Sequence, residues 1–330
     1  MLYEKKLNTV PERIINMIRH LTKECRSHPM DTADNAEEPA EHDENQYLHL
    51  IHDILTHGTM TEGRNGMTKS IFGAAMHFSL DGGKIPLLTT KKVAWKTCLK
   101  ELLWFMRGST SNRELQEQGV RIWNNNASRE FLDSRGLTHM EEGDLGPVYG
   151  HQWRHFNANY SSCDEDYSGQ GVDQLQNILD CLKDPVRRTS RRMVMSAWNP
   201  CQIDEMALPP CHVLCQFNVS EGDKLSCSLY QRSGDVGLGV PFNIASYSML
   251  THIIAAHCGL VAHEFVYVLG NAHIYDDHLP ALEEQLQLRP TSDPTIQILH
   301  THEDIGEYTV DDVYIADYAP HPPIKMVMRK

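Results

Sequence analysis

Residues 208–235 read LPPCHVLCQFNVSEGDKLSCSLYQRSGD, and this stretch contains two strong strand patterns. Val213 to Val219 is rich in apolar and β-branched residues, and Leu225 to Arg232 alternates apolar with polar side chains, so each predicts a strand. Apolar residues at helical spacing predict long helices over Trp95–Met106 and Ala245–Cys258. Strands and helices do not alternate regularly as they do in βαβ folds. We therefore expect an α+β fold, a single domain with a mixed β-sheet backed by helices.

Weaker patterns add further elements to this domain. A helix is predicted over Asp173–Leu182, and short strands are predicted over Arg192–Trp198, Thr295–Leu299 and Val313–Ile315. Ordered sequence begins near Gln46, where apolar residues start to recur at helical spacing.

The first 45 residues differ from the rest of the chain. Ile14 to Cys25 has the pattern of a short amphipathic helix, whereas Ser27 to Glu44 is acidic and lacks aromatic residues. A segment of that composition cannot bury enough apolar surface to fold. We expect residues 1–45 to be a disordered, flexible N-terminal extension and residues 46–330 to be the folded domain.

Composition limits the classes of partner. The chain has 330 residues, of which 41% are hydrophobic and 22% charged, and its formal net charge is -14. An acidic protein is poorly suited to non-specific binding of nucleic acid or of an anionic membrane surface. No apolar run approaches the roughly 20 residues that a membrane-spanning helix needs. We expect neither a membrane nor a nucleic-acid partner.

Cysteine and histidine content indicates no metal site. The nine cysteines are an odd number at irregular spacing, and the 19 histidines are scattered along the chain. Neither set has the spacing of a zinc site. This usage predicts free thiols, a reducing compartment and no bound metal.

Cys211 is the first candidate nucleophile. Pro209 and Pro210 fix the backbone directly before it, so its side chain is held in one direction, and His212 follows. A thiol becomes nucleophilic when nearby positive charge lowers its pKa. On this segment alone, a buried structural cysteine is the favoured interpretation. Arg232, at the end of the next predicted strand, changes the balance because its guanidinium can hold a phosphate or stabilise a thiolate.

Polar groups near Arg232 extend the candidate site. Gln231, Ser233 and Asp235 place a carboxamide, a hydroxyl and a carboxylate beside the guanidinium. Asn243 follows a few residues later, and an amide both donates and accepts hydrogen bonds. Such a group can recognise the O4 and N3–H edge of a uracil, whereas a carboxylate would suit cytosine.

Two further features have plain alternatives. Glu101 lies among apolar residues of a predicted helix, where a carboxylate is costly unless it is paired or catalytic. The alternative is a helix position that faces solvent. The four arginines of the run 187–192 are either a solvated basic turn or a site for a phosphate monoester; they are Arg187, Arg188, Arg191 and Arg192.

Together these segments resemble the thymidylate synthase family, and the resemblance runs from about Gln46 to Met328. The motifs Pro209–His212, Tyr230–Asp235 and Pro241–Tyr247 are the strongest carriers. Residues 152–156 and 131–134 resemble the eukaryotic and herpesviral type more than the compact bacterial type. The other matching segments are residues 86–91, 101–105, 143–150 and 272–275.

The resemblance implies an activity and a set of roles. Members of the family methylate dUMP to dTMP reductively with 5,10-methylenetetrahydrofolate, which becomes dihydrofolate, after a cysteine attacks C6 of the uracil. The implied catalytic residues are Cys211, Glu101, Tyr149, Asp235 and Arg232, with Arg232 also keeping Cys211 as a thiolate. The implied dUMP-binding residues are Arg64, Arg191, Arg192, Gln231, Arg232, Ser233, Asp235, Asn243, His273 and Tyr275. The implied folate-binding residues are Ile122, Trp123, Asn126, Asp235, Leu238, Gly239, Phe242 and Met328.

The same resemblance implies an assembly and a compartment. It predicts a homodimer in which Arg191 and Arg192 reach into the partner subunit's site. It predicts a cytoplasmic enzyme and leaves a share in the nucleus open.

The sequence departs from the family pattern at three places that bear on the site. The loop at Arg64 is one residue short, so the family's arginine falls on Arg64 or on Gly63, and we expect Arg64. The stretch before Arg191 is three residues longer than usual. The chain ends in Arg329–Lys330, where many relatives end in small apolar residues that fold over the folate and exclude water.

The last departure defines the alternatives. If two terminal cations loosen closure, water can divert the reaction to a hydroxymethyl product, which would make the protein a dUMP hydroxymethylase. Another alternative is a catalytically impaired relative that binds nucleotides or RNA. Trp123, which would shield the methylene group from water, and the intact set of catalytic residues favour the synthase.

Overall fold

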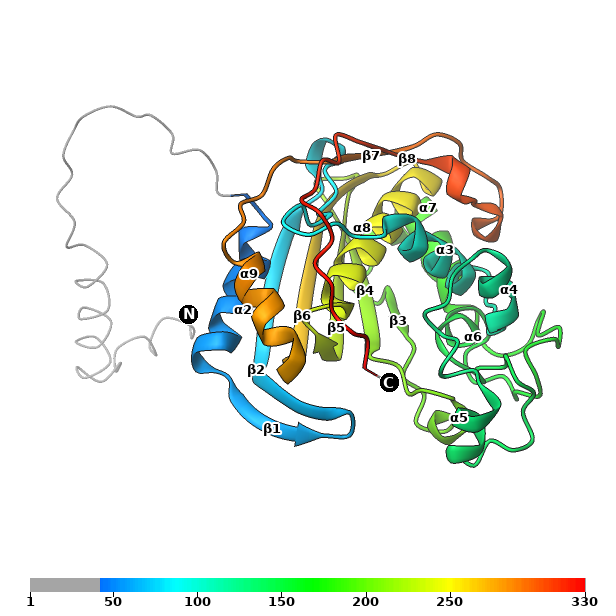
Figure 1. Cartoon of the computed structure of the whole chain (residues 1–330). Coiled ribbons are helices and arrows are strands. Elements are labelled where there is room, and N and C mark those ends of the chain that lie inside the picture. The colour runs from blue at the N-terminus through cyan, green and yellow to red at the C-terminus, as the bar shows by residue number, and fades with distance from the viewer. Residues whose placement is uncertain (1–41, 330) are drawn as a thin grey trace, which may run out of the picture. The chain divides into compact units, whose positions relative to one another are not determined.

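The computed structural model describes residues 42–329, which form a six-stranded sheet with helices packed against it (Figure 1). The strand order is β1-β2-β6-β5-β4-β3, and every neighbouring pair is antiparallel except β5 and β6. The prediction of an α+β domain with a mixed sheet is therefore confirmed. The strands are β1 (Thr59–Gly63), β2 (Gly66–Ser79), β3 (Val194–Ser196), β4 (His212–Ser220), β5 (Lys224–Asp235) and β6 (Val261–Tyr275).

Helix α8 (Gly239–His257) lies at the centre of the fold and packs against β5 and β6. Almost all of its residues after Gly239 are buried, as expected for a helix that is apolar on all sides. It connects the end of β5 to the start of β6, and a parallel pair requires such a crossover. Helix α3 (Trp95–Met106) packs on α8 and on α6 (Tyr149–His155), and α7 (Gln174–Lys183) packs on α6.

Shorter elements surround this core. The helices are α2 (Asn45–His57), α4 (Asn112–Glu117), α5 (Arg129–Ser134) and α9 (Leu279–Gln285), and β7 (Thr295–Ile298) pairs with β8 (Val313–Ala316) in a second, two-stranded sheet. Within residues 42–329, no helix is both long enough and apolar enough to cross a membrane.

Strands of the large sheet carry exposed apolar side chains. Phe72 on β2 is 84% exposed and Tyr230 on β5 is 38% exposed. Tyr230 pairs with Leu214 on β4 and with Val268 on β6, and the last two side chains are only partly buried. An apolar row across three strands is a candidate contact surface.

Most predicted elements are present with shifted ends. The helix over Trp95–Met106 is confirmed at both ends, and the strand predicted over Arg192–Trp198 is shorter, at Val194–Ser196. Helix α8 begins at Gly239, six residues before the predicted start at Ala245. Sequence patterns do not predict β1, β2 and β6 at all. The helix expected over Ile14–Cys25 lies outside the described residues.

Glu44 belongs to the fold, although it falls in the stretch expected to be disordered. Its side chain is buried, and its carboxylate accepts hydrogen bonds from the backbone N–H and the hydroxyl of both Thr89 and Thr90, at 2.6–2.8 Å. Thr89 and Thr90 in turn accept bonds from Thr291 and Gln285. One carboxylate therefore ties the start of the domain to its C-terminal third.

We expect Glu44→Ala to destabilise the protein by on the order of 3 kcal/mol, because it leaves buried N–H and hydroxyl donors without an acceptor. Urea unfolding measures the change. The matched control is Glu283→Ala on α9, whose side chain is exposed, and this change should have little effect. Equal midpoints for Glu44→Ala and the parent would show that the bonds of Glu44 do not stabilise the fold.

Candidate active site

Strand register brings the sequence motifs together at one edge of the sheet. Cys211 immediately precedes β4, and its carbonyl accepts a hydrogen bond from the N–H of Arg232 on β5 at 3.0 Å. Because β5 and β6 are parallel, their ends meet, and Asp235 pairs with His273. Tyr275 at the end of β6 pairs with Thr68, close to the β1–β2 turn that carries Arg64.

A pocket of about 610 Å³ opens at this edge. Seven of the residues predicted from sequence line it: Arg64, Cys211, Arg232, Ser233, Asp235, His273 and Tyr275. Sequence analysis did not identify the other lining residues, which are Thr61, Gly63, Asn65, Gly66, Thr68, Ser70, Arg135, Leu208, Pro209 and Asn271.

The Arg232 side chain is fixed by the two prolines that precede Cys211. Its Nε donates to the carbonyl of Pro210 at 2.9 Å, and its Nη2 donates to the carbonyl of Pro209 at 3.0 Å. The same Nη2 lies 3.8 Å from Cys211 Sγ. The Pro209–Pro210 segment therefore positions both the nucleophile and the cation beside it.

Burial and charge oppose each other at Cys211. Burial raises the pKa of the Cys211 thiol, and the positive charges of Arg232 and Arg64 lower it without cancelling that effect. Arg232 therefore acts on Cys211 in the expected direction, and its role in keeping Cys211 as a thiolate stays a prediction. Burial favours the thiol, whereas the two nearby guanidinium groups favour the ionised form.

Tyr149 contacts the backbone of the same cysteine. The Cys211 N–H donates to the Tyr149 hydroxyl at 2.8 Å. Burial raises the pKa of Tyr149 well above its ordinary value, so this phenol is neutral. Its position at the first turn of α6 gives the site a neutral hydroxyl next to the nucleophile.

Glu101 is buried and not solvent-facing, which settles the alternative raised by its sequence. Its side chain is 8% exposed, and Oε1 accepts a hydrogen bond from Trp123 Nε1 at 2.7 Å. Burial raises the pKa of Glu101 to about 7, although the bond from Trp123 lowers it. A carboxyl group that titrates near neutral pH is suited to proton transfer.

Asn243 is held by a buried network. Its Nδ2 lies 2.7 Å from His212 Nε2, and burial lowers the pKa of His212 to about 4, so the imidazole is neutral. The Tyr267 hydroxyl donates to Gln231 Oε1 at 2.6 Å and lies 3.4 Å from Asn243 Oδ1. Among the described residues, His212 Nδ1 has no hydrogen-bond partner, and that leaves a buried polar atom beside Cys211.

Asp235 is held against the start of α8. Asp235 Oδ1 accepts from the N–H groups of Gly237 at 2.9 Å and Leu238 at 3.3 Å. Lys91 donates to the Gly237 carbonyl, and burial lowers the pKa of Lys91 to about 8. A Cβ atom on Gly239 would lie 3.7 Å from Asp235 Cβ, so the helix start is close against the carboxylate.

The remaining predicted residues lie around this pocket or away from it. Ile122 and Asn126 flank Trp123 and are partly buried, Phe242 is partly buried on α8, and Met328 is 54% exposed on the C-terminal segment. Arg191 and Arg192 are exposed just before β3 and do not line the pocket. Neither arginine side chain has a hydrogen bond or ion pair to another described residue.

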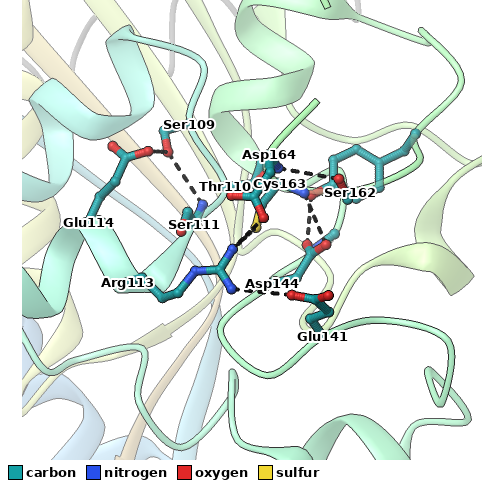
Figure 2. A network of polar contacts seen from close by, with 12 residues as sticks. Ser109, Thr110, Ser111, Arg113, Glu114, Glu141, Asp144, Ser162, Cys163 and Asp164 are labelled. Atoms are coloured by element: carbon teal, nitrogen blue, oxygen red, sulfur yellow. Dashed lines mark hydrogen bonds and ion pairs between the residues drawn. The ribbon is translucent and has the colours of Figure 1, made fainter. Parts of the chain in front are cut away.

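A polar network supports the turn that leads into α6 (Figure 2). Asp144 Oδ1 accepts from the Gly146 N–H at 2.8 Å and from Tyr160, and Oδ2 accepts from the Cys163 N–H at 3.0 Å. Gly146 has a φ of +74°, and a Cβ there would lie 2.2 Å from the Glu205 carbonyl oxygen. Position 146 can therefore hold only glycine. The turn lies directly before α6, so its conformation sets where Tyr149 begins that helix.

Sequence reasoning missed Arg135, His212 and Tyr267 as site residues. Arg135 directly follows the segment 131–134 that resembles eukaryotic and herpesviral relatives, and a cation next to that segment was the available signal. Tyr267 lies on β6, which no sequence pattern predicted. In the part of the chain that the structure describes, no group of three or more acidic, histidine or cysteine side chains is placed to hold a metal ion.

Comparison with known proteins agrees with this geometry. The family model for thymidylate synthase matches residues 45–330. The thymidylate synthase of Human herpesvirus 8 type P (isolate GK18) is 53% identical over 288 residues, covering 87% of this chain and 84% of the relative. The Homo sapiens thymidylate synthase is 52% identical over 295 residues, covering 89% and 93%. That of Equine herpesvirus 2 (strain 86/87) is 51% identical over 288 residues, covering 87% and 98%.

The motifs Pro209–His212 and Tyr230–Asp235 thus meet at one edge of one sheet, and the relatives match the chain over nearly the whole described domain. From the agreement of site geometry, family model and relatives, the chain belongs to the thymidylate synthase family.

Proposed function

We propose that this protein converts dUMP to dTMP by reductive methylation with 5,10-methylenetetrahydrofolate, releasing dihydrofolate. The observation that carries the proposal is Cys211, which lies 3.8 Å from Arg232 in a pocket that Arg64 also lines. A thiol, two guanidinium groups and a buried amide are the groups that an anionic uracil nucleotide requires for binding and covalent attack.

Residues that line the pocket, together with Asn243 and the buried network that contacts it, divide by chemistry among the parts of dUMP. Arg64, Arg232 and Ser233 bind the phosphate, because guanidinium and hydroxyl groups suit its oxygens. His273 and Tyr275 bind the deoxyribose hydroxyl. Asn243 recognises uracil, and the network from Gln231 through Tyr267 holds its amide in place. The unpartnered His212 Nδ1 supplies one more polar atom for a ligand or a water near the base.

The folate binds beside the nucleotide. Ile122, Trp123 and Asn126 supply one side, and the start of α8 supplies the other through Leu238, Gly239 and Phe242. Asp235 Oδ1 is occupied by two backbone N–H groups, so Oδ2 is available to a pterin N–H. When bound, 5,10-methylenetetrahydrofolate supplies both the one-carbon unit and the hydride.

Catalysis begins at Cys211. Its thiolate adds to C6 of the uracil, which makes C5 nucleophilic toward the one-carbon unit. Arg232 and Arg64 favour the thiolate, and Tyr149 holds the backbone N–H of Cys211. Glu101, with a pKa of about 7, exchanges protons with the base through ordered water.

A homodimer completes the site in this proposal. Phe72 and Tyr230 are exposed apolar side chains of the large sheet, and a second copy packed on the sheet would bury such side chains. Arg191 and Arg192 are exposed and lie outside their own subunit's pocket, which fits donation to the phosphate site of the partner.

We also place the enzyme in the cytoplasm, because all cysteines of residues 42–329 are free.

Incubation with dUMP and 5,10-methylenetetrahydrofolate tests the proposal. Absorbance follows dihydrofolate, and mass spectrometry identifies the nucleotide. dTMP and dihydrofolate in equal amounts support the synthase. Hydroxymethyl-dUMP with tetrahydrofolate would identify a hydroxymethylase instead, and the absence of any product would refute both.

We expect Cys211→Ser to lose at least about 1,000-fold in turnover while binding dUMP within a few-fold of the parent, because the pocket remains and only the nucleophile is lost. Single-turnover kinetics and calorimetric titration measure the two quantities. Cys201→Ser, an exposed cysteine outside the pocket, is the control and should behave like the parent. Parent-like turnover in Cys211→Ser would remove Cys211 from the mechanism.

Glu101→Gln should lower turnover at least about 100-fold and also make the protein more stable at high pH. Burial raises the pKa of Glu101 from 4.5 to about 7, so the folded state binds a proton more tightly than the unfolded chain. Stability is therefore lost as pH rises from 4.5 through 7. The variant should gain on the order of 3 kcal/mol at pH 8 and much less at pH 5.

Urea unfolding at several pH values measures this difference, with exposed Glu117→Gln on α4 as the control. A stability difference that does not change with pH would show that Glu101 has an ordinary pKa.

Mixing two inactive variants tests the shared site. We expect Cys211→Ser and the double variant Arg191→Ala with Arg192→Ala to regain activity when they are denatured and refolded together, because one site of each mixed dimer has both Cys211 and the partner's arginines. Random pairing predicts about a quarter of the parent's activity. If the arginines act within their own subunit, mixing restores nothing.

A further inference from the structure

The C-terminal segment runs back from β8 to the edge of the sheet that holds the pocket. Figure 1 shows it in red, ending near the β1–β2 hairpin. Three of its last residues each contact a different part of the site. A Cβ on Gly237 would lie 3.0 Å from Met326 Sδ, so Met326 covers the turn after Asp235. The Val327 carbonyl lies 2.7 Å from His278 Nε2, and Arg329 makes the third contact.

Arg329 forms ion pairs with two consecutive aspartates. Its Nη2 lies 2.9 Å from Asp276 Oδ1 and 2.9 Å from Asp277 Oδ1, and its Nε donates to Asp277 at 3.2 Å. These aspartates open η4 (Asp276–His278), which directly follows β6. A single guanidinium thus bridges two carboxylates, an arrangement that uses the fixed fork of arginine.

The same guanidinium lies against residues that line the pocket. It is 5.8 Å from the centre of the Tyr275 ring, on the ring face. A Cβ on Gly66 would lie 3.5 Å from Arg329 Nη1, so the guanidinium also contacts the β1–β2 turn next to Arg64. Arg329 therefore joins the tail, the end of β6 and the turn that carries the phosphate-binding arginine.

His278 strengthens this attachment from within the core. The side chain is fully buried, and its Nδ1 lies 3.8 Å from Asp235 Oδ1, which is an electrostatic contact and not a hydrogen bond. Burial lowers the pKa of His278, but Asp235, the Val327 carbonyl and Asp277 together raise it above the ordinary value. A chain of contacts thus runs from the proposed folate-binding Asp235 through His278 to the tail.

We infer that Arg329, Asp276 and Asp277 form a tail latch that holds the C-terminal segment against the rim of the nucleotide pocket, at Tyr275 and the β1–β2 turn, and so positions Met328 at the folate site. Arg329 is a positioning residue, because it acts through the tail and the β1–β2 turn. The inference rests on the proposed function for its effect on catalysis but not for the attachment itself, which exists without ligands. The terminal cation of Arg329 closes the site and does not loosen it.

The latch has a chemical consequence. After the one-carbon unit is transferred to C5 of dUMP, loss of the C5 proton expels tetrahydrofolate and leaves a methylene group on C5. Hydride transfer from tetrahydrofolate to this methylene, with departure of Cys211 from C6, gives dTMP and dihydrofolate. If water reaches the C5 methylene first, its oxygen bonds to that carbon, one proton leaves to solvent, and Cys211 departs from C6. The products are then hydroxymethyl-dUMP and tetrahydrofolate, with no oxidation of the folate. A latched tail favours the first outcome because it excludes water.

Hydrogen–deuterium exchange of the ligand-free protein tests the attachment. In Arg329→Ala, and in the double variant Asp276→Asn with Asp277→Asn, the amides of residues 322–329 should exchange about three- to tenfold faster than in the parent. Lys325→Ala is the matched control: it removes an exposed cation from the same tail, and Lys325 has no ion pair within the described chain. Unchanged tail exchange in Arg329→Ala overturns the latch.

Steady-state kinetics with dUMP and 5,10-methylenetetrahydrofolate tests the consequence. We expect Arg329→Ala to raise the folate KM about three- to tenfold and to increase the hydroxymethyl-dUMP fraction, with the thermal midpoint unchanged. Arg329→Lys should recover part of the loss. In a protein that already carries Asp276→Asn and Asp277→Asn, the Arg329→Ala change should cause no further rise in the folate KM or in the hydroxymethyl-dUMP fraction.

Each outcome separates the latch from the proposed function. An Arg329→Ala effect of equal size in both backgrounds overturns the pairing with Asp276 and Asp277. If the parent makes no dTMP while the exchange results are as expected, the proposed function fails and the latch stands. If the parent makes dTMP and Arg329→Ala keeps the parent's folate KM and product ratio, the positioning role fails alone.

Discussion

The parallel pairing of β5 with β6 is the constraint on which the site depends. In an antiparallel pair, the end of β5 would meet the start of β6, and Asp235 would lie far from His273. The parallel register instead puts both carboxyl ends at one edge, and the antiparallel partners β4 and β2 bring Cys211 and the Arg64 turn to the same edge. Helix α8 makes this possible, because it carries the chain back along the sheet between the two strands.

Burial sets the chemistry of the groups gathered there. Glu101 titrates near pH 7, His212 is neutral, and Cys211 has a raised pKa, and in each case desolvation is the largest cause. The nearby guanidinium groups oppose this effect at Cys211 without reversing it. The ligand-free site therefore keeps its reactive groups close to neutral, which limits the cost of burying them. Desolvation depends on packing from α3, α6 and α8 together, so no single motif encodes it.

Sequence alone could predict the family, the fold class and seven of the residues that line the pocket, because the order of the motifs along the chain can be recognised without knowledge of packing. It could not predict β2 and β6. Gly73, Ala74 and Ala75 weaken the strand pattern of β2, and the polar groups Asn271 and His273 interrupt that of β6. Asn271 and His273 line the pocket, so on β6 the polar residues of the site obscure the strand pattern. Tyr267, whose hydroxyl lies within hydrogen-bond distance of both Gln231 and Asn243, was missed because it lies on β6.

The role of a charged residue is also hard to predict from sequence. Glu44 reads as part of an acidic linker, yet its carboxylate is buried on two threonines. The carboxylate of Glu101 accepts a hydrogen bond from the indole N–H of Trp123, and nothing in the sequence around Glu101 indicates this partner. Arg329 reads as a cation that would disturb a closing tail, yet it lies between two aspartates that follow Tyr275 by one and two residues. In each case the partner is distant in sequence, and the free energy of a charge is set by its partner and its burial. The effect of a cation near the end of the chain therefore depends on whether the fold supplies carboxylates to pair with it, as Asp276 and Asp277 do for Arg329.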